Sequence, residues 1–290
     1  MALFDCTCDA QSGNARALTF TTAHGDFHTP MFMPVGTSAT VKGITPPQLR
    51  ELKSQVVLAN TYHLSQRPGE DVVAEAGGVH KFMNYDGPML TDSGGFQIFS
   101  LADTRKLDDD GVTFRSIYDG SYVRWTPEEN MRIQEALGAD IAMQLDQCPP
   151  YPATREFVER AVDLSAMWAR RCLAAHKRPD QTLFGIVQGG MNLDLRLESI
   201  RRLREIEDES LAAGGRRFGG FGIGGYSVGE DHETMFETLG QVARALPDDR
   251  PRYLMGVGNP TTLVRAVGEG VDMFDCVLPT RTARMGTAFS

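Results

Sequence analysis

The chain has 290 residues, with 29 basic and 38 acidic side chains and a formal net charge of −9. Apolar residues make up 41% of the sequence and charged residues 23%, which excludes a disordered chain and fits a globular protein with a sizeable core. The acidic balance argues against broad nonspecific binding to nucleic acid, which needs a basic surface, but it allows a local basic patch.

The sequence shows neither a membrane-spanning segment nor a pattern of paired cysteines. No stretch approaches the ~18 consecutive apolar residues of a membrane-spanning helix, and residues 1–11 show no secretory signal. The five cysteines form no regular framework, which fits a reducing compartment, so we expect a cytoplasmic protein. Zinc at the isolated pair Cys6 and Cys8 would need further ligands such as His24 or His28. We favour two free thiols on a terminal strand.

Short apolar runs alternate with helical patterns along the chain. The runs that predict β-strands are 31–35, 56–59, 89–91, 141–145, 183–187, 218–223, 253–257 and 271–274. The patterns that predict helices are 46–53, 68–76, 127–137, 153–175, 193–213, 230–245 and 261–268. Thr126 followed by Pro127 and Glu128 is a typical helix start. This order predicts an α/β fold, a (β/α)8 TIM-type barrel that occupies residues 1–290 as a single domain.

A long segment separates the third and fourth predicted strands. Residues 100–124 read as a loop or small hairpin, with turn signals at 108–111 and 118–120. Long insertions at the active-site end of a barrel often serve as lids or substrate-binding elements. We therefore expect a lid-like insertion here.

Polar residues of a few types follow the predicted strands. Asp92, Asp146 and Asp275 end the third, fourth and eighth strands, and Gln188 follows the fifth. Asn60 follows the second strand, and glycines follow the sixth and seventh. Because the C-terminal strand ends of a barrel carry its chemistry, we expect these groups to meet at one mouth. The match to G-x-G-x-x-G at 220–225 is weak, because no helix opens directly after it.

These residue types indicate a reaction class. Paired carboxylates without an obvious set of metal ligands suit acid/base and nucleophilic work, as in retaining glycoside chemistry. An Asp–Gln–backbone set can also hydrogen-bond the edge of a purine, which offers donors and acceptors. Together they predict a glycosyl transfer at a nucleoside.

Six motifs in order resemble those of the bacterial tRNA-guanine transglycosylases (queuine tRNA-ribosyltransferases). They are TDSGGFQ at 91–97, DQC at 146–148 with YPA at 151–153, GIVQGG at 185–190, GGYSVGE at 224–230, YLMGVG at 253–258 and DMFDCVLPTR at 272–281. The resemblance runs from about residue 16 to residue 290. It implies a base exchange at guanine 34 of tRNAs with a GUN anticodon, as a step of queuosine biosynthesis.

The resemblance also implies roles for individual residues. Asp275 is expected to attack ribose C1′ and form a covalent RNA intermediate, and Asp92 to act as general acid and base. The base is expected to be held by Asp146, Gln188 and the Gly225 backbone, with the pocket continued by Ser93, Gly94, Gly95 and Phe96. Contacts to the RNA are expected from Gly256, Val257, Gly258, Asn259, Pro260, Thr261, Thr262, Thr280, Arg281, Thr282, Ala283 and Arg284. The target base must leave the stack, which is easiest in an anticodon loop.

The incoming base follows from the same resemblance. Cys148 and Val228 match the bacterial enzymes, which favours 7-aminomethyl-7-deazaguanine (preQ1) over the bulkier queuine. Its ammonium tail needs a carbonyl or carboxylate, and Glu230 is one candidate; an equal alternative is a first-turn acid placed by the helix dipole. Gln147 stands where many bacterial members have Glu, and Tyr226 where Leu is common, so Tyr226 bears on the fit around the tail.

The chain departs from the family at its end. The family carries a structural zinc site, C-x-C-x-x-C…His, and the last barrel helix beyond the final strand. Here 15 residues follow Asp275, so we expect a truncated chain with neither the zinc ligands nor that helix. No organic cofactor is implied. The resemblance implies a homodimer, and the zinc region contributes to that interface.

Two other functions agree less well with the sequence. A catalytically silent RNA-binding subunit of the same family should lack one essential carboxylate, yet Asp92 and Asp275 are both present. A barrel glycosidase acting on free sugars should carry aromatic platforms at the mouth, yet neither Trp125 nor Trp168 ends a predicted strand. The transglycosylase is the favoured interpretation.

Overall fold

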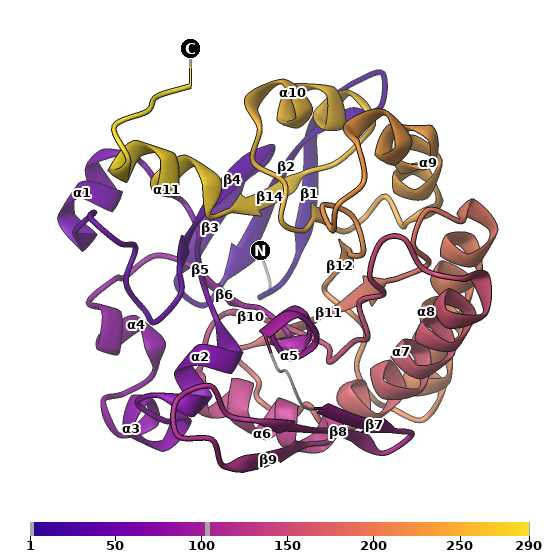
Figure 1. The fold of residues 1–290 in the computed structure, drawn as a ribbon. Helices are drawn as coiled ribbons and strands as arrows, with labels where there is room; N and C mark the ends of the chain where they lie inside the picture. The colour runs from indigo at the N-terminus through magenta and orange to yellow at the C-terminus, as the bar shows by residue number, and fades with distance from the viewer. Residues whose placement is uncertain (1–2, 102–104, 290) are drawn as a thin grey trace.

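Eight parallel strands close into a barrel surrounded by helices in the computed structural model of the chain (Figure 1). The structure describes residues 3–101 and 105–289. The strands neighbour one another in the order β10-β11-β12-β13-β14-β4-β5-β6. Their bounds are β4 (Met31–Gly36), β5 (Val57–Ala59), β6 (Met89–Thr91), β10 (Ile141–Met143), β11 (Thr182–Val187), β12 (Gly220–Ile223), β13 (Arg252–Leu254) and β14 (Met273–Cys276). The predicted strands and the predicted fold class are confirmed.

Helices lie between the strands, as predicted. The confirmed helices are α1 (Pro46–Glu51), α3 (Glu70–Glu75), α6 (Pro127–Leu137), α7 (Arg155–Ala175), α8 (Leu193–Ala212), α9 (His232–Ala245) and α10 (Pro260–Gly268). The start of α6 follows its sequence signal, because the Thr126 hydroxyl accepts the Glu129 N–H at 3.2 Å. The longer helices α6, α7, α8 and α9 each bury several apolar side chains.

The structure also contains short helices that the sequence pattern does not predict. They are α2 (Thr61–Gln66), α4 (Val79–Met83), α5 (Gly95–Leu101) and α11 (Leu278–Arg284). At five to seven residues each, they are too short for an apolar repeat to show in the sequence. α11 follows the last strand and has no buried residue, so it lies at the rim rather than packing on the wall.

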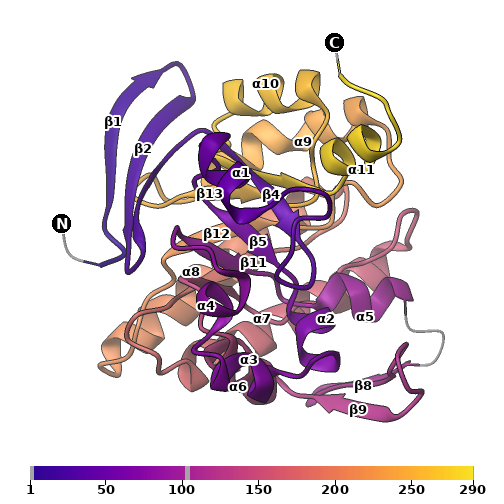
Figure 2. The same ribbon diagram turned by 90° about the vertical axis from the view of Figure 1, so that its left-hand side faces the viewer.

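An antiparallel sheet covers the floor of the barrel, the end at which its strands begin. This sheet consists of β1 (Cys6–Ser12), β2 (Ala15–Thr22) and β3 (Gly25–His28). Figure 2 shows its hairpin at one end of the molecule and α5 and α11 at the other. Phe20 and Phe27 are fully buried and share a core cluster with Met31 and Met33 of β4. The sheet therefore closes the barrel opposite its mouth, the end at which the strands finish.

Buried charges fasten this sheet to the floor. Arg16 of β2 pairs with Asp272, which precedes β14, and both are buried. The Arg16 guanidinium also donates to the carbonyls of Asp248 (2.8 Å) and Arg250 (3.1 Å). Bidentate geometry and satisfied donors make this one of the favourable kinds of buried ion pair.

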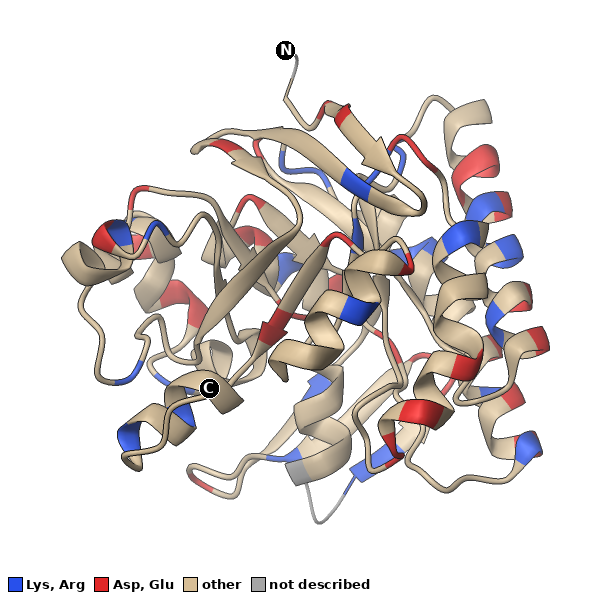
Figure 3. Cartoon of the chain, turned by 90° about the horizontal axis from the view of Figure 1, so that it is seen from above, with Lys and Arg blue, Asp and Glu red and all other residues tan. Residues whose placement is uncertain are grey.

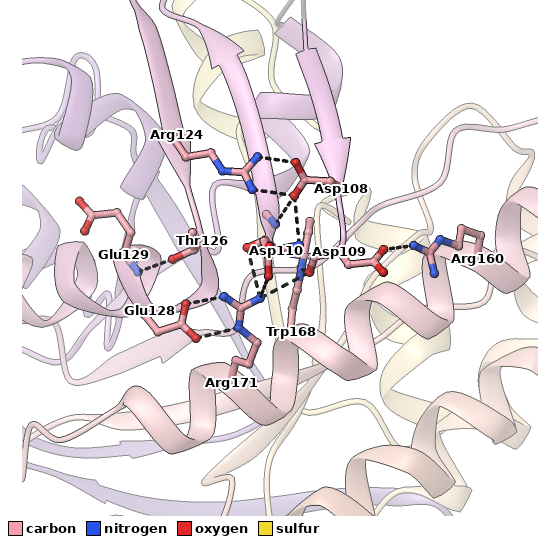
Figure 4. Close-up of polar contacts among 11 residues, drawn as sticks. Asp108, Asp109, Asp110, Arg124, Thr126, Glu128, Glu129, Arg160, Trp168 and Arg171 are labelled. Carbon is pink, nitrogen blue, oxygen red and sulfur yellow. Dashed lines mark hydrogen bonds and ion pairs between the residues drawn. The ribbon is translucent and has the colours of Figure 1, made fainter.

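The predicted insertion forms a second antiparallel sheet, with β7 (Arg105–Asp108), β8 (Gly111–Arg115) and β9 (Tyr122–Trp125). Residues 102–104 of the insertion lie outside the described part of the chain. Figure 4 shows how the β7–β8 turn is fastened to the outer helices. The Trp168 indole donates to the Asp109 carbonyl at 2.9 Å, and Arg171 forms a fork with Glu128, both bonds at 2.7 Å. The sheet is thus fixed to α6 and α7.

Along the described residues, no helix combines the length and the apolar character that crossing a membrane requires.

Candidate active site

A cavity of about 410 Å³ opens at the mouth of the barrel, and all eight strand ends contribute to its walls. This volume suits a ligand of nucleoside size. Most of the base-binding and catalytic residues predicted from the sequence meet here. The predicted site residues that line the cavity are Asp92, Ser93, Phe96, Asp146, Gln188, Gly225, Gly256, Asp275 and Arg281.

Asp92 follows β6 and is held by the turn after β5. The backbone N–H of Thr61 donates to its Oδ1 at 2.8 Å, and the Asn60 amide donates to its Oδ2. Burial raises the pKa of Asp92 to about 7, the negative charge of Asp275 adds to the rise, and the Thr61 N–H opposes it. A carboxyl group with this pKa can give and take a proton near neutral pH.

Asp275 lies on β14 itself and not after it. The Tyr253 hydroxyl donates to its Oδ1 at 2.6 Å, and the Gly256 N–H donates to the same atom at 2.7 Å. Among the described residues, Oδ2 receives no hydrogen bond. Burial raises the pKa of Asp275, and the two donors offset part of that rise. One oxygen is thus held in place while the other is left to react.

Asp146 and Gln188 form an array on the opposite wall. The Ser93 hydroxyl donates to Asp146 Oδ1 and the Gln188 amide nitrogen to Oδ2, both at 2.7 Å. Burial raises the pKa of Asp146, against both of these donors. The Gln188 Oε1 is buried and has no partner among the described residues. Asp146 lines the cavity and its carboxylate keeps lone pairs for a ligand that carries N–H groups, whereas Gln188 Oε1 lies buried beside Gly225.

Gly225 approaches this array more closely than any other residue type could. Its φ is +70°, and a Cβ there would lie 2.5 Å from Gln188 Oε1. A side chain would strain the backbone and displace the amide. The glycine is thus explained by its close approach to Gln188.

The remaining predicted base contacts differ in how they meet the cavity. Phe96 lies in the first turn of α5 and is 51% exposed, so its ring is available for stacking. Cys148 and Val228 line the cavity. Glu230 does not line it, because its carboxylate accepts the N–H groups of Ser227 (2.5 Å) and Val228 (3.0 Å). Glu230 therefore shapes the loop behind the pocket wall.

The predicted RNA contacts divide by exposure. Val257, Gly258 and Thr262 are buried, and the Asn259 side chain caps α10 by accepting from Thr261 at 3.1 Å. Arg281 is exposed at the cavity rim. Figure 3 shows α11, beside the C-terminus, with Lys or Arg as its charged residues and no Asp or Glu, whereas the long outer helices mix both signs. The exposed members of the set are Gly256, Pro260, Thr261, Arg281, Ala283 and Arg284.

Sequence reasoning missed several groups that shape the site. Asn60 ends the second strand in a polar run, which is a usable signal, but nothing local predicts its bond to Asp92. Tyr253 begins a strand, and its bond to Asp275 depends on the pairing of β13 with β14. His63 also lines the cavity and contacts the Tyr118 hydroxyl of the insertion at 2.7 Å.

The part of the chain that the structure describes holds one group of three clustered metal-ligand types, His24, His80 and Asp140 at the floor. The two imidazole rings are stacked 3.5 Å apart with planes 14° apart. Imidazole coordinates a metal in the plane of its ring, and two nearly parallel planes do not converge on one ion. The group therefore does not fit zinc. Cys6 and Cys8 lie outside this group, on β1, and neither forms a disulfide.

Comparison with known proteins agrees with this geometry. The family described as queuine tRNA-ribosyltransferase matches residues 9–290. A queuine tRNA-ribosyltransferase of Desulforamulus reducens is 55% identical over 276 residues, which cover 95% of this chain and 72% of the relative. Those of Gloeobacter violaceus (54% identical, 99% of this chain and 73% of the relative) and Synechococcus elongatus (53%, 98% and 71%) are similarly close. The chain therefore belongs to the queuine tRNA-ribosyltransferases, a family of tRNA-guanine transglycosylases, which are pentosyltransferases.

Proposed function

We propose that this protein exchanges guanine 34 in GUN-anticodon tRNAs for 7-aminomethyl-7-deazaguanine, through an intermediate in which Asp275 is bonded to ribose C1′. The enzyme class follows from the family. The position in the tRNA, the incoming base and the covalent step are supported by the resemblance and by the arrangement of the carboxylates at the mouth.

In the first half of the proposed reaction, Asp275 Oδ2 attacks C1′ and the bond from C1′ to N9 of guanine breaks. The electron pair of that bond moves to the guanine ring, which takes a proton from Asp92 and leaves. The products are free guanine and a ribosyl ester of Asp275. This role is supported by the hydrogen bonds of Asp275: Oδ1 accepts both of them, and Oδ2 accepts none from the described residues.

In the second half, the incoming base gives its N9 proton to the Asp92 carboxylate. N9 then forms a bond to C1′, and the bond from C1′ to Asp275 breaks. Asp92 regains the proton that it gave up, and Asp275 regains its charge. A pKa near 7 suits a group that must serve as acid in one half and base in the other.

Recognition of the base is assigned to the acceptor array. Guanine presents N–H groups at N1 and N2 and an acceptor at O6. The Asp146 carboxylate, held by the Gln188 amide, accepts from the N–H groups, and the Gly225 N–H donates to O6. Phe96 stacks on the ring, and Arg281 and Arg284 meet phosphates at the rim.

The observation that carries the proposal is the contrast between two carboxyl groups that face one cavity. Burial raises the pKa of both groups, and that of Asp92 reaches about 7. Asp275 has both donors on one oxygen and the other oxygen free, whereas Asp92 has a donor on each oxygen. Groups whose environments push their pKa values apart take the separate roles of nucleophile and proton carrier.

The test is incorporation of labelled guanine into a GUN-anticodon tRNA by the full chain and by its Asp275→Ala variant. We expect wild-type incorporation and none in the variant. RNA should remain attached to the wild-type protein under denaturing conditions and not to the variant. Unchanged incorporation by Asp275→Ala would contradict the nucleophile assignment.

Three further properties complete the proposal. The exposed rim, including α11, receives the anticodon arm, and the insertion sheet borders it. By resemblance, the protein works in the cytoplasm as a homodimer, and the barrel acts as one domain. Sedimentation of the purified chain with and without tRNA tests the dimer.

A further inference from the structure

Arg196 is buried below the base-binding wall without an acidic partner. It lies in the first turn of α8 and has no exposed surface. No ion pair links it to a carboxylate among residues 3–101 and 105–289, and its Nη2 has no hydrogen-bond partner there. Burying a cation costs free energy unless hydrogen bonds or other favourable contacts offset it. Contacts with two backbone carbonyls and one aromatic ring offset this cost for Arg196.

Two of these contacts join the turns that hold the base. The Arg196 Nε donates to the Gly190 carbonyl at 2.6 Å, and its Nη1 donates to the Gly224 carbonyl at 2.9 Å. Gly190 follows Gln188 after β11, and Gly224 precedes Gly225 after β12. One planar guanidinium thus fixes the spacing of the two strand ends that carry base contacts.

The third contact is with an aromatic ring on the cavity wall. The guanidinium carbon lies 3.5 Å from the centre of the Tyr226 ring. Tyr226 is 3% exposed, lines the cavity and contacts the Thr238 hydroxyl at 2.6 Å. A cation over an aromatic face is stabilised most when both are shielded from water. Tyr226 is therefore held between Arg196 and the ligand space.

The peptide group between Gly224 and Gly225 connects Arg196 with the pocket. In a trans peptide the C=O and the N–H point in opposite directions. Arg196 holds the Gly224 C=O, so the Gly225 N–H points away from Arg196. Gly224, Gly225 and Cys148 all line the cavity. The peptide whose carbonyl Arg196 holds is therefore part of the cavity wall.

We propose that Arg196 is a positioning residue for base binding. It holds the Gly224 carbonyl and supports Tyr226, and thereby sets the direction of the Gly225 N–H and its spacing from Gln188. The ligand class is a purine or 7-deazapurine base with an oxygen at C6, which accepts from Gly225. This inference rests on the proposed function, and it concerns the base alone, since Arg196 does not reach the RNA rim.

The experiment compares Arg196→Lys with wild type in guanine exchange and in equilibrium binding of guanine by calorimetry. A lysine ammonium cannot hold both carbonyls in the geometry of the guanidinium fork. We expect KM for guanine and its dissociation constant to rise about tenfold to a hundredfold, from the loss of charge-assisted hydrogen bonds. KM for tRNA should stay within about twofold, because no phosphate contact is changed.

The matched control is Arg202→Lys on the same helix, where the guanidinium is half-buried and paired with Glu198 and Asp163. It should leave both constants unchanged. Tyr226→Ala keeps Arg196 but removes the ring, and it should raise KM for guanine as well, so it carries the test if Arg196→Lys does not fold.

The outcomes separate the two proposals. Guanine binding by Arg196→Lys at the wild-type affinity overturns the inference, and so does a lower kcat at unchanged KM, which indicates only a loss of folded enzyme. Wild type that binds guanine without exchanging it contradicts the proposed reaction, and the ratio of binding constants then still decides the role of Arg196.

Discussion

The aspartates at the two ends of the barrel differ in how many of their lone pairs are occupied. At the floor, Asp140 meets four nitrogen atoms: the N–H and ring Nδ1 of His24, the ring Nε2 of His80 and the N–H of Met89. At the mouth, Asp275 receives two hydrogen bonds, both on one oxygen. A carboxylate can accept about four hydrogen bonds, so Asp140 is saturated and Asp275 is not.

This difference changes the sign of the pKa shift. Burial would raise the pKa of Asp140, but hydrogen bonds from His24 and His80 outweigh it and hold the pKa well below its usual range. Burial prevails at the mouth and raises the pKa of Asp92, Asp146 and Asp275. The floor uses a buried charge to stabilise the fold. The mouth keeps its charges incompletely satisfied, which costs stability and leaves reactive oxygens.

Asp92→Asn should give the largest effect at the mouth. The amide cannot carry the proton between guanine and the incoming base, so we expect exchange to fall about 10²- to 10⁴-fold. The Thr61 N–H still finds the amide oxygen, and the free energy of unfolding should change by no more than ~1–2 kcal/mol. Guanine exchange and urea unfolding measure the two quantities. Normal turnover would remove Asp92 from the acid/base role.

At the floor, Asp140→Asn should reduce stability and leave the rate of exchange unchanged. The new NH₂ group would face nitrogen donors from His24, His80 or Met89, so we expect a loss of about 2–4 kcal/mol in the free energy of unfolding. The folded fraction should keep the wild-type kcat. Asp86→Asn is the control, because Asp86 is exposed and pairs with Arg50 at the surface, and the melting temperature of this variant should match wild type. A loss of kcat without a loss of stability would refute the division of roles.

The pH dependence of stability should separate the two ends as well. Asp92 has a folded pKa of about 7, above its unfolded value of about 4, so the folded state binds the extra proton between these values. Its contribution to stability is therefore lost as pH rises from about 4 through 7. Asp140, with a lowered pKa, contributes above about pH 4 and loses that contribution as pH falls.

Unfolding by urea at pH 5 and pH 8 measures this difference. Between these values, wild type should lose about 2 kcal/mol relative to Asp92→Asn. The difference between wild type and Asp140→Asn should stay nearly constant, apart from the loss of the His24 contribution as pH rises through its raised pKa. Parallel pH curves for wild type and Asp92→Asn would contradict the raised pKa of Asp92.

The mouth could be predicted from the sequence because its main residues end apolar strands. Asp92, Asp146 and Gln188 come directly after short apolar runs, and barrel topology alone brings such positions together. The sequence predicts a strand that ends at residue 274, just before Asp275, whereas β14 includes Asp275. Strand ends cannot be predicted to within one residue. The carboxylates and the amide of the site thus follow from local pattern and fold class.

The partners of these carboxylates could not be predicted, because they depend on register and side-chain reach. Tyr253 contacts Asp275 only because β13 and β14 pair with Tyr253 opposite Met273. Arg196 is different, since it shares a helix face with Ile200, Leu203 and Glu207, all buried, at helical spacing. A charged residue on an apolar helix face was therefore a visible signal, although its partners at Gly190 and Gly224 were not.

Of the variants at the mouth, Tyr253→Phe should change the rate of exchange least. It tests directly whether the hydrogen bonds on one oxygen of Asp275 control the charge of this carboxyl group. It removes one of the two donors on Oδ1 and leaves the Gly256 N–H, so the mouth moves further from the saturated floor. A hydrogen bond to a charged oxygen favours the charged form, and its loss should raise the pKa of Asp275 by about one unit. Less of the nucleophile is then ionised at low pH.

The rate at which RNA becomes attached to the protein in a single turnover reports this change. In Tyr253→Phe, the acidic limb of its pH profile should move about one unit upward, which lowers the rate about tenfold on that limb. Tyr122→Phe removes a hydroxyl from an exposed position on the insertion sheet and should leave the profile in place. An equal loss of rate at every pH would mean that Tyr253 acts on packing at the mouth rather than on the charge of Asp275. The contrast between the two ends of the barrel would then have to be explained by burial alone.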